Sequence, residues 1–281
     1  MPSIGDSTLS LGIQRHLSLH TQAVGRSMHR LSSGLRITRA AEDPAGLAVA
    51  MRLSAREQSI GQAIRNASDG VSALQIAEGA MSESSGLLIR LRELAVQSAN
   101  GSLSSSERAV LDQEAQGIVQ EIDRIAGVND FNGMNLIDGS TASIDLHTGP
   151  GASDTLTVTG VDVRASQIGS GAGSQVSDID ISTQAGATTA IGIADAAINQ
   201  VSSARGALGT VQSRAESQIR SLQISQENLM AAQSRIMDTD IASETAELTK
   251  TTMLQQMSAS LLAQGNQQSR IVLDLLSATF R

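Results

Sequence analysis

A single apolar row limits what this chain can fold into more than any other feature of its sequence. The row recurs every seven residues, a spacing that returns to one side of an α-helix after two turns. It predicts one long helix over residues 60–101, and apolar residues on both sides of the row predict more than one packing neighbour. The row comprises Ile60, Ala67, Leu74, Met81, Leu88 and Ala95, and the flanking residues are Leu87, Leu94, Ile89 and Val96.

A second row of the same kind appears late in the chain. It predicts another long helix over about residues 189–236, which would span about 70 Å at a rise of about 1.5 Å per residue. The row comprises Ala194, Val201, Leu208, Ala215, Leu222, Leu229 and Ile236.

A shorter helix is predicted between these two. Ser104 and Glu107 are spaced as a capping box, in which each side chain accepts a hydrogen bond from the other residue's backbone. Apolar residues follow at spacings of four and three up to Gly127. Only three residues separate Asn100 from Ser104, so we expect this helix to fold back antiparallel on the first and the three helices to form one rod.

Residues 140–186 differ from the rest in composition, being rich in Gly, Ser, Thr and Asp. Two runs within them, 142–147 and 154–163, alternate between apolar and polar residues and predict a β-hairpin that turns at Gly149-Pro150-Gly151. An isolated two-stranded ribbon is only marginally stable. We therefore expect the hairpin to bury Leu156 and Val158 against the helices.

Both ends of the chain carry apolar rows that polar residues interrupt. The first row is expected to form a helix that ends at Ser32-Ser33-Gly34, because Asp43-Pro44 opposes its continuation. Neither row could stabilise an isolated helix, so we expect the two ends to pair with each other and to be disordered in the monomer. We call the core that would form when the two ends pair the assembly core. Its candidate residues are Leu17, Val24, Leu31, Leu248, Leu261 and Leu262.

Composition supports an extended molecule over a globule. An ordinary globular core for 281 residues would use aromatic side chains, and this chain has only two phenylalanines. The predicted fold class is mainly α: an elongated antiparallel helical bundle or coiled-coil rod with a small β-hairpin region, plus paired terminal helices. The expected domains are residues 1–42 with 239–281, and a rod of 43–238 that carries the hairpin region at about 140–186.

Several function classes lack support in the sequence. The absence of cysteine excludes disulfides and thiolate chemistry. Residues 1–56 hold seven arginines against three acids, but without interleaved aromatics this balance favours packing of opposite termini over nucleic acid. His16 and His20 lack an accompanying carboxylate, so no metal site is expected, and neither are catalytic residues or cofactors. No segment predicts a membrane span or a cleavable signal peptide.

Six motifs stand out along the chain: RLSSGLRIT (30–38), AGLAVA (45–50), NASDGVSALQIAEG (66–79), RLRELAVQSANG (90–101), NDFNGMNLIDG (129–139) and ASETAELTK (242–250). In this order they resemble the motifs of the bacterial flagellins, the subunits of the flagellar filament. With the helical segments between them they cover nearly the whole chain apart from about 45 middle residues, where flagellins insert large outer domains. This chain resembles a short flagellin without those domains.

The resemblance implies a function in motility. Subunits would be exported unfolded through the flagellar type III channel and would polymerise head-to-tail outside the cell, since a contact that does not close generates a helical filament. The implied partners are other copies of the chain, an export chaperone that holds the C-terminal end, and the filament cap and hook-junction proteins.

The resemblance also implies recognition by the flagellin-sensing Toll-like receptor of animals, at the matching positions Arg90, Leu94 and Glu114, which are equally candidates for contacts between subunits. Two alternative functions stay open. A hook-filament junction protein shares the paired terminal helices, although the runs at 90–101 and 242–250 match flagellin itself. A secreted enzyme on a helical scaffold would need a catalytic motif, and no such motif is apparent.

Overall fold

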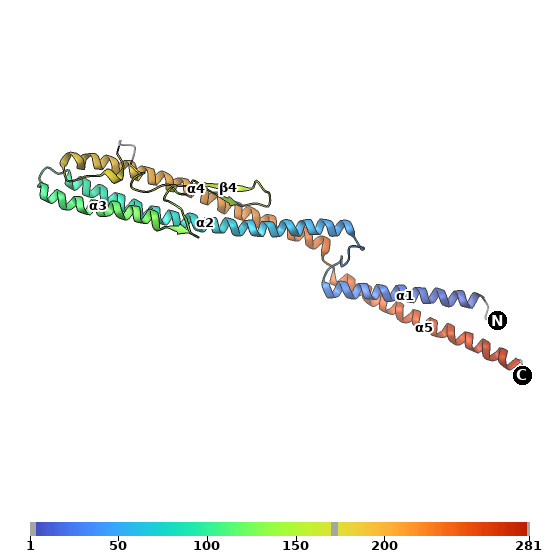
Figure 1. Ribbon diagram of the computed structural model, residues 1–281. Helices are drawn as coiled ribbons and strands as arrows, with labels where there is room; N and C mark the ends of the chain where they lie inside the picture. Colours follow the sequence, from blue (N-terminus) through green and yellow to red (C-terminus); the bar gives the residue numbers. More distant parts are fainter. Residues whose placement is uncertain (1–3, 170–173, 280–281) are drawn as a thin grey trace. The chain divides into compact units, whose positions relative to one another are not determined.

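The protein is mainly helical, as the sequence predicts (Figure 1). The structure, a computed structural model, describes residues 4–169 and 174–279, with side chains described for 10–169 and 174–267. Two compact units are distinguished, which we call the rod unit (Arg56–Glu227) and the terminal unit (Met1–Ala55 with Asn228–Arg281). The elements are α1 (Ile4–Ser33), α2 (Pro44–Ser98), α3 (Ser105–Val128), β1 (Asp130–Phe131), β2 (Met134–Asn135), β3 (Ser143–His147), β4 (Thr155–Thr159), η2 (Val176–Asp178), α4 (Gln184–Met237) and α5 (Ile241–Thr279).

Within the rod unit, α2 and α4 run antiparallel. Three side-chain pairs join them, and each step forward along α2 is matched by a step back along α4: Glu57 with Gln226 (2.6 Å), Glu78 with Arg205 (3.8 Å) and Arg92 with Asp195 (2.6 Å). The apolar rows predicted from the sequence form the core of this unit. Their buried members are Ile60, Ala67, Leu74, Met81, Leu88 and Ala95 of α2, and Ala194, Val201, Leu208, Ala215 and Leu222 of α4.

Helix α3 covers one end of this pair. It begins with the predicted capping box: Ser104 Oγ accepts the amide N–H of Glu107 (3.4 Å), and Glu107 Oε2 accepts that of Ser104 (2.7 Å). Arg90 of α2 pairs with Glu114 of α3 at 2.8 Å, which confirms the antiparallel return. Val128, the last residue of α3, is 14 residues beyond Glu114, so it lies level with about Ile76 of α2. The part of α2 before Ile76 is therefore not covered by α3 and needs another neighbour.

The β3–β4 hairpin supplies part of that cover. Its strands pair antiparallel, and Leu156 and Val158 are buried, as expected from the sequence. The sequence predicts a second strand that reaches Val163, whereas β4 ends at Thr159. The chain leaves the hairpin there because Val163 N–H donates to the carbonyl of Ile137 (2.9 Å) instead of continuing the ladder.

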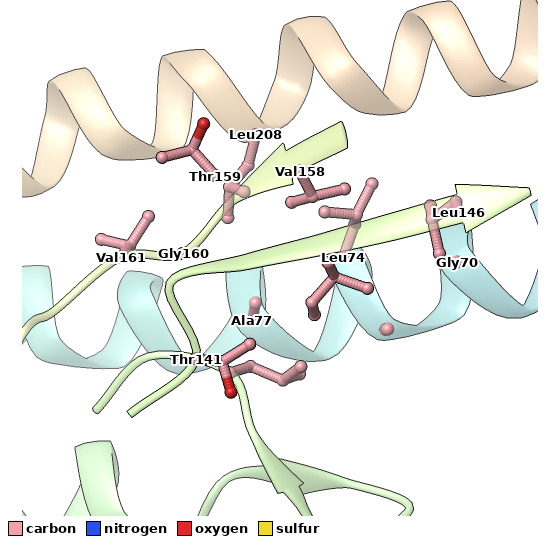
Figure 2. A pocket seen from close by; sticks show the side chains of 13 residues that line it. Gly70, Leu74, Ala77, Thr141, Leu146, Val158, Thr159, Gly160, Val161 and Leu208 are labelled. Carbon is pink, nitrogen blue, oxygen red and sulfur yellow. The ribbon is translucent and has the colours of Figure 1, made fainter. Parts of the chain in front are cut away.

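The hairpin is fastened to both long helices. Asn66 of α2 and Gln218 of α4 donate side-chain N–H groups to the carbonyls of His147 (3.2 Å) and Thr148 (3.5 Å). Next to these hydrogen bonds Leu146 lies directly over Gly70, where a Cβ atom would collide with a Leu146 methyl group unless that side chain shifted, so glycine suits this close approach. Figure 2 shows the apolar cavity under the hairpin; at about 30 Å³ it has room for about one water molecule.

Residues 163–169 and 174–181 belong to a connecting segment that the periodicity of the sequence does not predict. The apolar side chains of these two stretches are buried, and their backbone is held by side chains of α2 and α3. Asp123 accepts the N–H of Ala165 (2.7 Å), Asp112 accepts that of Ile181 (2.9 Å), and Ser98 donates to the Ile181 carbonyl (2.5 Å). Short-range periodicity gives no signal for such a segment, because its bonds join residues 42, 69 and 83 positions apart. The buried side chains are Val163, Ala165, Ile168, Val176, Ile179 and Ile181.

Two details of α2 correct the sequence analysis. The helix begins at Pro44, well before the predicted start at residue 60, because Asp43 Oδ1 accepts the N–H of Gly46 (2.8 Å) as an N-cap and proline suits the first helical position. The Asp43-Pro44 pair therefore starts α2 as well as separating it from α1. The prediction of more than one packing neighbour for α2 is confirmed by α3 and α4, but not every flanking residue is buried, since Ile89 and Val96 are about half exposed.

The terminal unit pairs the two ends of the chain, as predicted (Figure 1). Gln255 of α5 donates to Thr21 of α1 (3.0 Å), and Glu244 near the start of α5 faces Arg30 near the end of α1 (3.7 Å), so the helices are antiparallel. Among the described side chains of α1 and α5, the most buried are polar: Ser27, Thr251 and Ser258.

Candidate interaction surfaces

The terminal unit exposes many apolar side chains. They occur on both helices at positions that the α1–α5 seam does not use, and each is more than half exposed. Such surface is unusual for a protein that acts alone. On α1 they are Leu11, Leu19 and Met28, and on α5 they are Ile241, Met253, Met257 and Leu261.

The six residues predicted for the assembly core divide between the seam and the surface. Five of them are half-buried on the sides of α1 and α5 that carry Ser27 and Thr251. Leu261 is 51% exposed and lies on the surface. The half-buried residues are Leu17, Val24, Leu31, Leu248 and Leu262.

A second candidate surface lies on the rod unit around Arg90. Its guanidinium bridges two carboxylates, Glu114 of α3 (2.8 Å) and Glu93 of its own helix (3.2 Å). The hydrogen bonds to Glu114, with those to Glu93 next, raise the pKa of Arg90. All three side chains are about half exposed, so the charges are accessible to a partner and the ion pairs add little stability.

Leu94 does not belong to that surface. The sequence places it about a quarter turn from the core row, but its side chain is 1% exposed and packs in the core. The reason is that α2 has two neighbours at this level, α3 and α4, so its buried face is wider than one row. The apolar residues that are exposed near Arg90 are Ile89 and Val96, together with Val110 of α3.

A polar hollow of about 310 Å³ lies in the terminal unit between α1 and the connector before α2. Arg26, His29 and Arg39 line it together with Glu42. The Glu42 carboxylate is already engaged: it accepts the N–H of Thr38 (3.0 Å) and faces Arg30 (3.8 Å). The hydrogen bond from the Thr38 backbone, and after it the positive charge of Arg30, lower the pKa of Glu42.

Two kinds of site are absent from the part of the chain that the structure describes. Among the described residues, no group of three or more His, Cys, Asp or Glu side chains could hold a metal ion. Nor do the described residues include a helix long and apolar enough to cross a membrane. The exposed apolar side chains and the exposed Arg90–Glu114 pair are suited to contacts with other macromolecules.

Comparisons with known proteins agree with this conclusion. Residues 4–142 match the family model of the bacterial flagellin N-terminal helical region, and residues 191–276 match that of the C-terminal helical region. The chain is 38% identical over 267 residues to a flagellin of Halalkalibacterium halodurans, which covers 95% of this chain and 97% of the relative. It is 36% identical over 283 residues to the flagellar filament 30.7 kDa core protein of Treponema maltophilum, which covers 98% and 99%.

A solved structure assigned to a flagellar hook-associated protein from Vibrio parahaemolyticus matches 70% of this chain and 100% of its own, with a TM-score of 0.61 and 17% identity. At that identity the likeness concerns the fold alone. The sequence relatives, in contrast, align over nearly their whole length with this chain.

Proposed function

The chain belongs to the bacterial flagellins and is a structural subunit of the flagellar filament, not an enzyme; from this premise we propose that the paired helices α1 and α5 are its main polymerising element. The observation that carries the proposal is the apolar surface that these helices leave exposed, above all Leu19, Met257 and Leu261. Covering it with the same helices of neighbouring copies, in head-to-tail contacts that do not close, would build a helical filament.

The weak seam between α1 and α5 supports a coupling between folding and assembly. Ordering a residue costs roughly 1–2 kcal/mol, and a seam whose most buried residues are Ser27, Thr251 and Ser258 offers little apolar burial to offset that cost. We therefore expect α1 and α5 to be stably helical only when neighbouring subunits cover them. Such coupling would also limit polymerisation inside the cell.

Limited proteolysis of the full-length monomer tests this coupling. We expect protease to remove both ends and to leave a helical core of about residues 45–238, whereas filaments should resist cleavage. Hydrogen exchange provides a second measurement on the same sample. Strong amide protection at Leu17, Val24, Leu248 and Leu261 in dilute monomer would show that the ends fold alone and would contradict the proposal.

Several partners of the subunit follow from this proposal. Flexible ends suit export in an unfolded state through the flagellar type III channel, with a chaperone that covers α5 before export. The filament cap and hook-junction proteins would bind the subunits at the two ends of the filament. Chaperone binding should fall when Leu261 and Leu262 are replaced by Asp, which calorimetry on the monomer would measure.

We further propose that the Arg90–Glu114 surface contacts the flagellin-sensing Toll-like receptor of animals, or a neighbouring subunit in the filament. Both side chains are exposed and already positioned by their ion pair, whereas buried Leu94 could act only by supporting α2 beneath them. A receptor would reach this surface on the free subunit.

Receptor activation by soluble monomer tests the second proposal. We expect Arg90→Ala and Glu114→Ala to reduce signalling strongly. Arg124→Ala is the matched control, since Arg124 is also an exposed arginine paired with a glutamate, Glu121 at 2.6 Å. Equal signalling by all three variants and the parent would remove the Arg90–Glu114 surface from the receptor contact.

A further inference from the structure

The methionines of this chain are distributed unequally between the two units. In the terminal unit five of the described methionines have exposed side chains, and in the rod unit Met81 is fully buried while Met134 is exposed. Exposed methionine is uncommon on protein surfaces, because its thioether side chain is apolar. The five exposed methionines of the terminal unit are Met28, Met51, Met230, Met253 and Met257.

Two of these methionines form a pair on α5. Met253 and Met257 are 59% and 61% exposed, and their spacing of four residues places them one above the other on the helix. Thr251 and Ser258 lie on the opposite side of α5 and are buried in the seam with α1. The thioethers therefore point away from the seam, toward the surface that we assign to neighbouring subunits.

This placement has a chemical consequence. A peroxide oxidises a thioether by transferring one oxygen: the sulfur lone pair attacks the peroxide, the O–O bond breaks, sulfur is oxidised to the sulfoxide and the other oxygen leaves as water. The sulfoxide is polar and chiral, so it disrupts contacts that were built on the apolar thioether. Accessibility controls the rate, so Met253 and Met257 are open to oxidation in the free subunit and would be shielded in a contact.

We propose that Met253 and Met257 are an oxidation site that controls polymerisation: peroxide converts them to sulfoxides in the free subunit, the modified subunit adds to filaments less readily, and assembled subunits are protected. The proposal rests on the polymerising role of α5 proposed above. Because methionine sulfoxide is enzymatically reducible, the block is reversible.

The experiment treats full-length monomer with hydrogen peroxide, removes the peroxide, locates the oxidised residues by mass spectrometry and measures the critical concentration for polymerisation. For the parent we expect oxidation at Met253 and Met257, none at Met81, and a critical concentration about tenfold higher, equivalent to about 1.4 kcal/mol per subunit. Reduction with methionine sulfoxide reductases A and B should restore the original value. Filaments treated in the same way should keep both thioethers.

The variant Met253→Leu/Met257→Leu keeps the apolar volume and removes both sulfurs. It should be much less sensitive to peroxide than the parent, because Met28 is then the only exposed methionine left among the described side chains of α1 and α5. In contrast, Met134→Leu, which removes an exposed thioether of the rod unit, should show the same rise in critical concentration as the parent. The proposal is overturned if oxidised parent polymerises normally, if reduction does not restore it, or if the double leucine variant is as sensitive as the parent.

A further variant separates failure of this inference from failure of the proposed function. Met253→Gln/Met257→Gln makes both positions polar without oxidation. If it polymerises normally, α5 is not the polymerising surface and both proposals fall. If it does not polymerise, yet peroxide leaves Met253 and Met257 unmodified in free parent monomer, the proposed function stands and the oxidation site is rejected.

Discussion

The rod unit and the terminal unit are built from helices of similar kind but bury them in opposite ways. In the rod unit α2 packs against α4 along its length, with α3 and then the β3–β4 hairpin as a further layer, and the inward residues are aliphatic. In the terminal unit two helices share one seam, and among its described side chains the only fully buried apolar residues are Ile37 and Ala50. The two units therefore differ in the number of packed layers.

The largest effect is expected from Leu208→Asp in the rod unit. Leu208 is 6% exposed and contacts the cavity beneath the hairpin (Figure 2). An unpaired carboxylate there costs several kcal/mol, comparable to the stability of a whole domain, so the rod unit should lose its cooperative unfolding transition in circular dichroism. Val110→Asp, at an exposed position of α3, is the control. Equal melting temperatures of both variants would show that Leu208 is not a core position.

Leu94→Ala should have the next largest effect. Removing this buried side chain is expected to destabilise the rod unit by about 2–5 kcal/mol, whereas Arg90→Ala, one turn away on the surface, should change stability by less than about 0.5 kcal/mol. Urea unfolding measures both. If Leu94→Ala unfolds at the parental urea concentration, the side chain is not a core residue and a direct role in binding becomes the better explanation.

Gly70→Ala probes the hairpin layer. The new methyl group would collide with Leu146, so we expect the hairpin to shift and the rod unit to lose about 1–3 kcal/mol. Gly79→Ala, on the same helix with open space around it, should instead gain about 0.5–1 kcal/mol through helix propensity. If the melting temperature shifts in the same direction for both variants, the close packing of the hairpin on α2 is refuted.

The smallest effect on subunit stability is expected from Leu261→Asp in the terminal unit. This residue is on the surface, so the monomer should melt within about 0.5 kcal/mol of the parent, yet polymerisation should be lost. Ile224→Asp alters an equally exposed residue of the rod unit and should polymerise nearly normally. Sedimentation of polymer from monomer separates these outcomes, and normal polymerisation of Leu261→Asp would contradict the assignment of α5.

Most of the fold could be predicted because its strongest signals are local. The seven-residue rows on α2 and α4 and the Ser104–Glu107 capping box needed only nearby residues to be recognised, and each is confirmed. The predicted start of α2 at residue 60 is too late because the row continues one heptad earlier, at Leu53, and breaks only at Gly46. The antiparallel return of α3 followed from the shortness of its loop.

The candidate surfaces were harder to predict because exposure depends on neighbours distant in sequence. One helix periodicity places Ile89 and Leu94 on the two flanks of the same row, and only the positions of α3 and α4 decide that Leu94 is buried while Ile89 is exposed. The same holds for Leu261, which the row on α5 does not distinguish from half-buried Leu262.

The antiparallel pairing of α2 with α4 has a consequence for the order of folding. Arg90 and Glu114 are 24 residues apart in the chain, Arg92 and Asp195 are 103 apart, and Glu57 and Gln226 are 169 apart. Closing longer loops costs more entropy and low-contact-order pairs form sooner, so α2 and α3 should associate first and α4 should then add from residue 195 toward residue 226. Ile122→Val in α3 should therefore slow folding, whereas Ile60→Val, equally buried, should mainly speed unfolding.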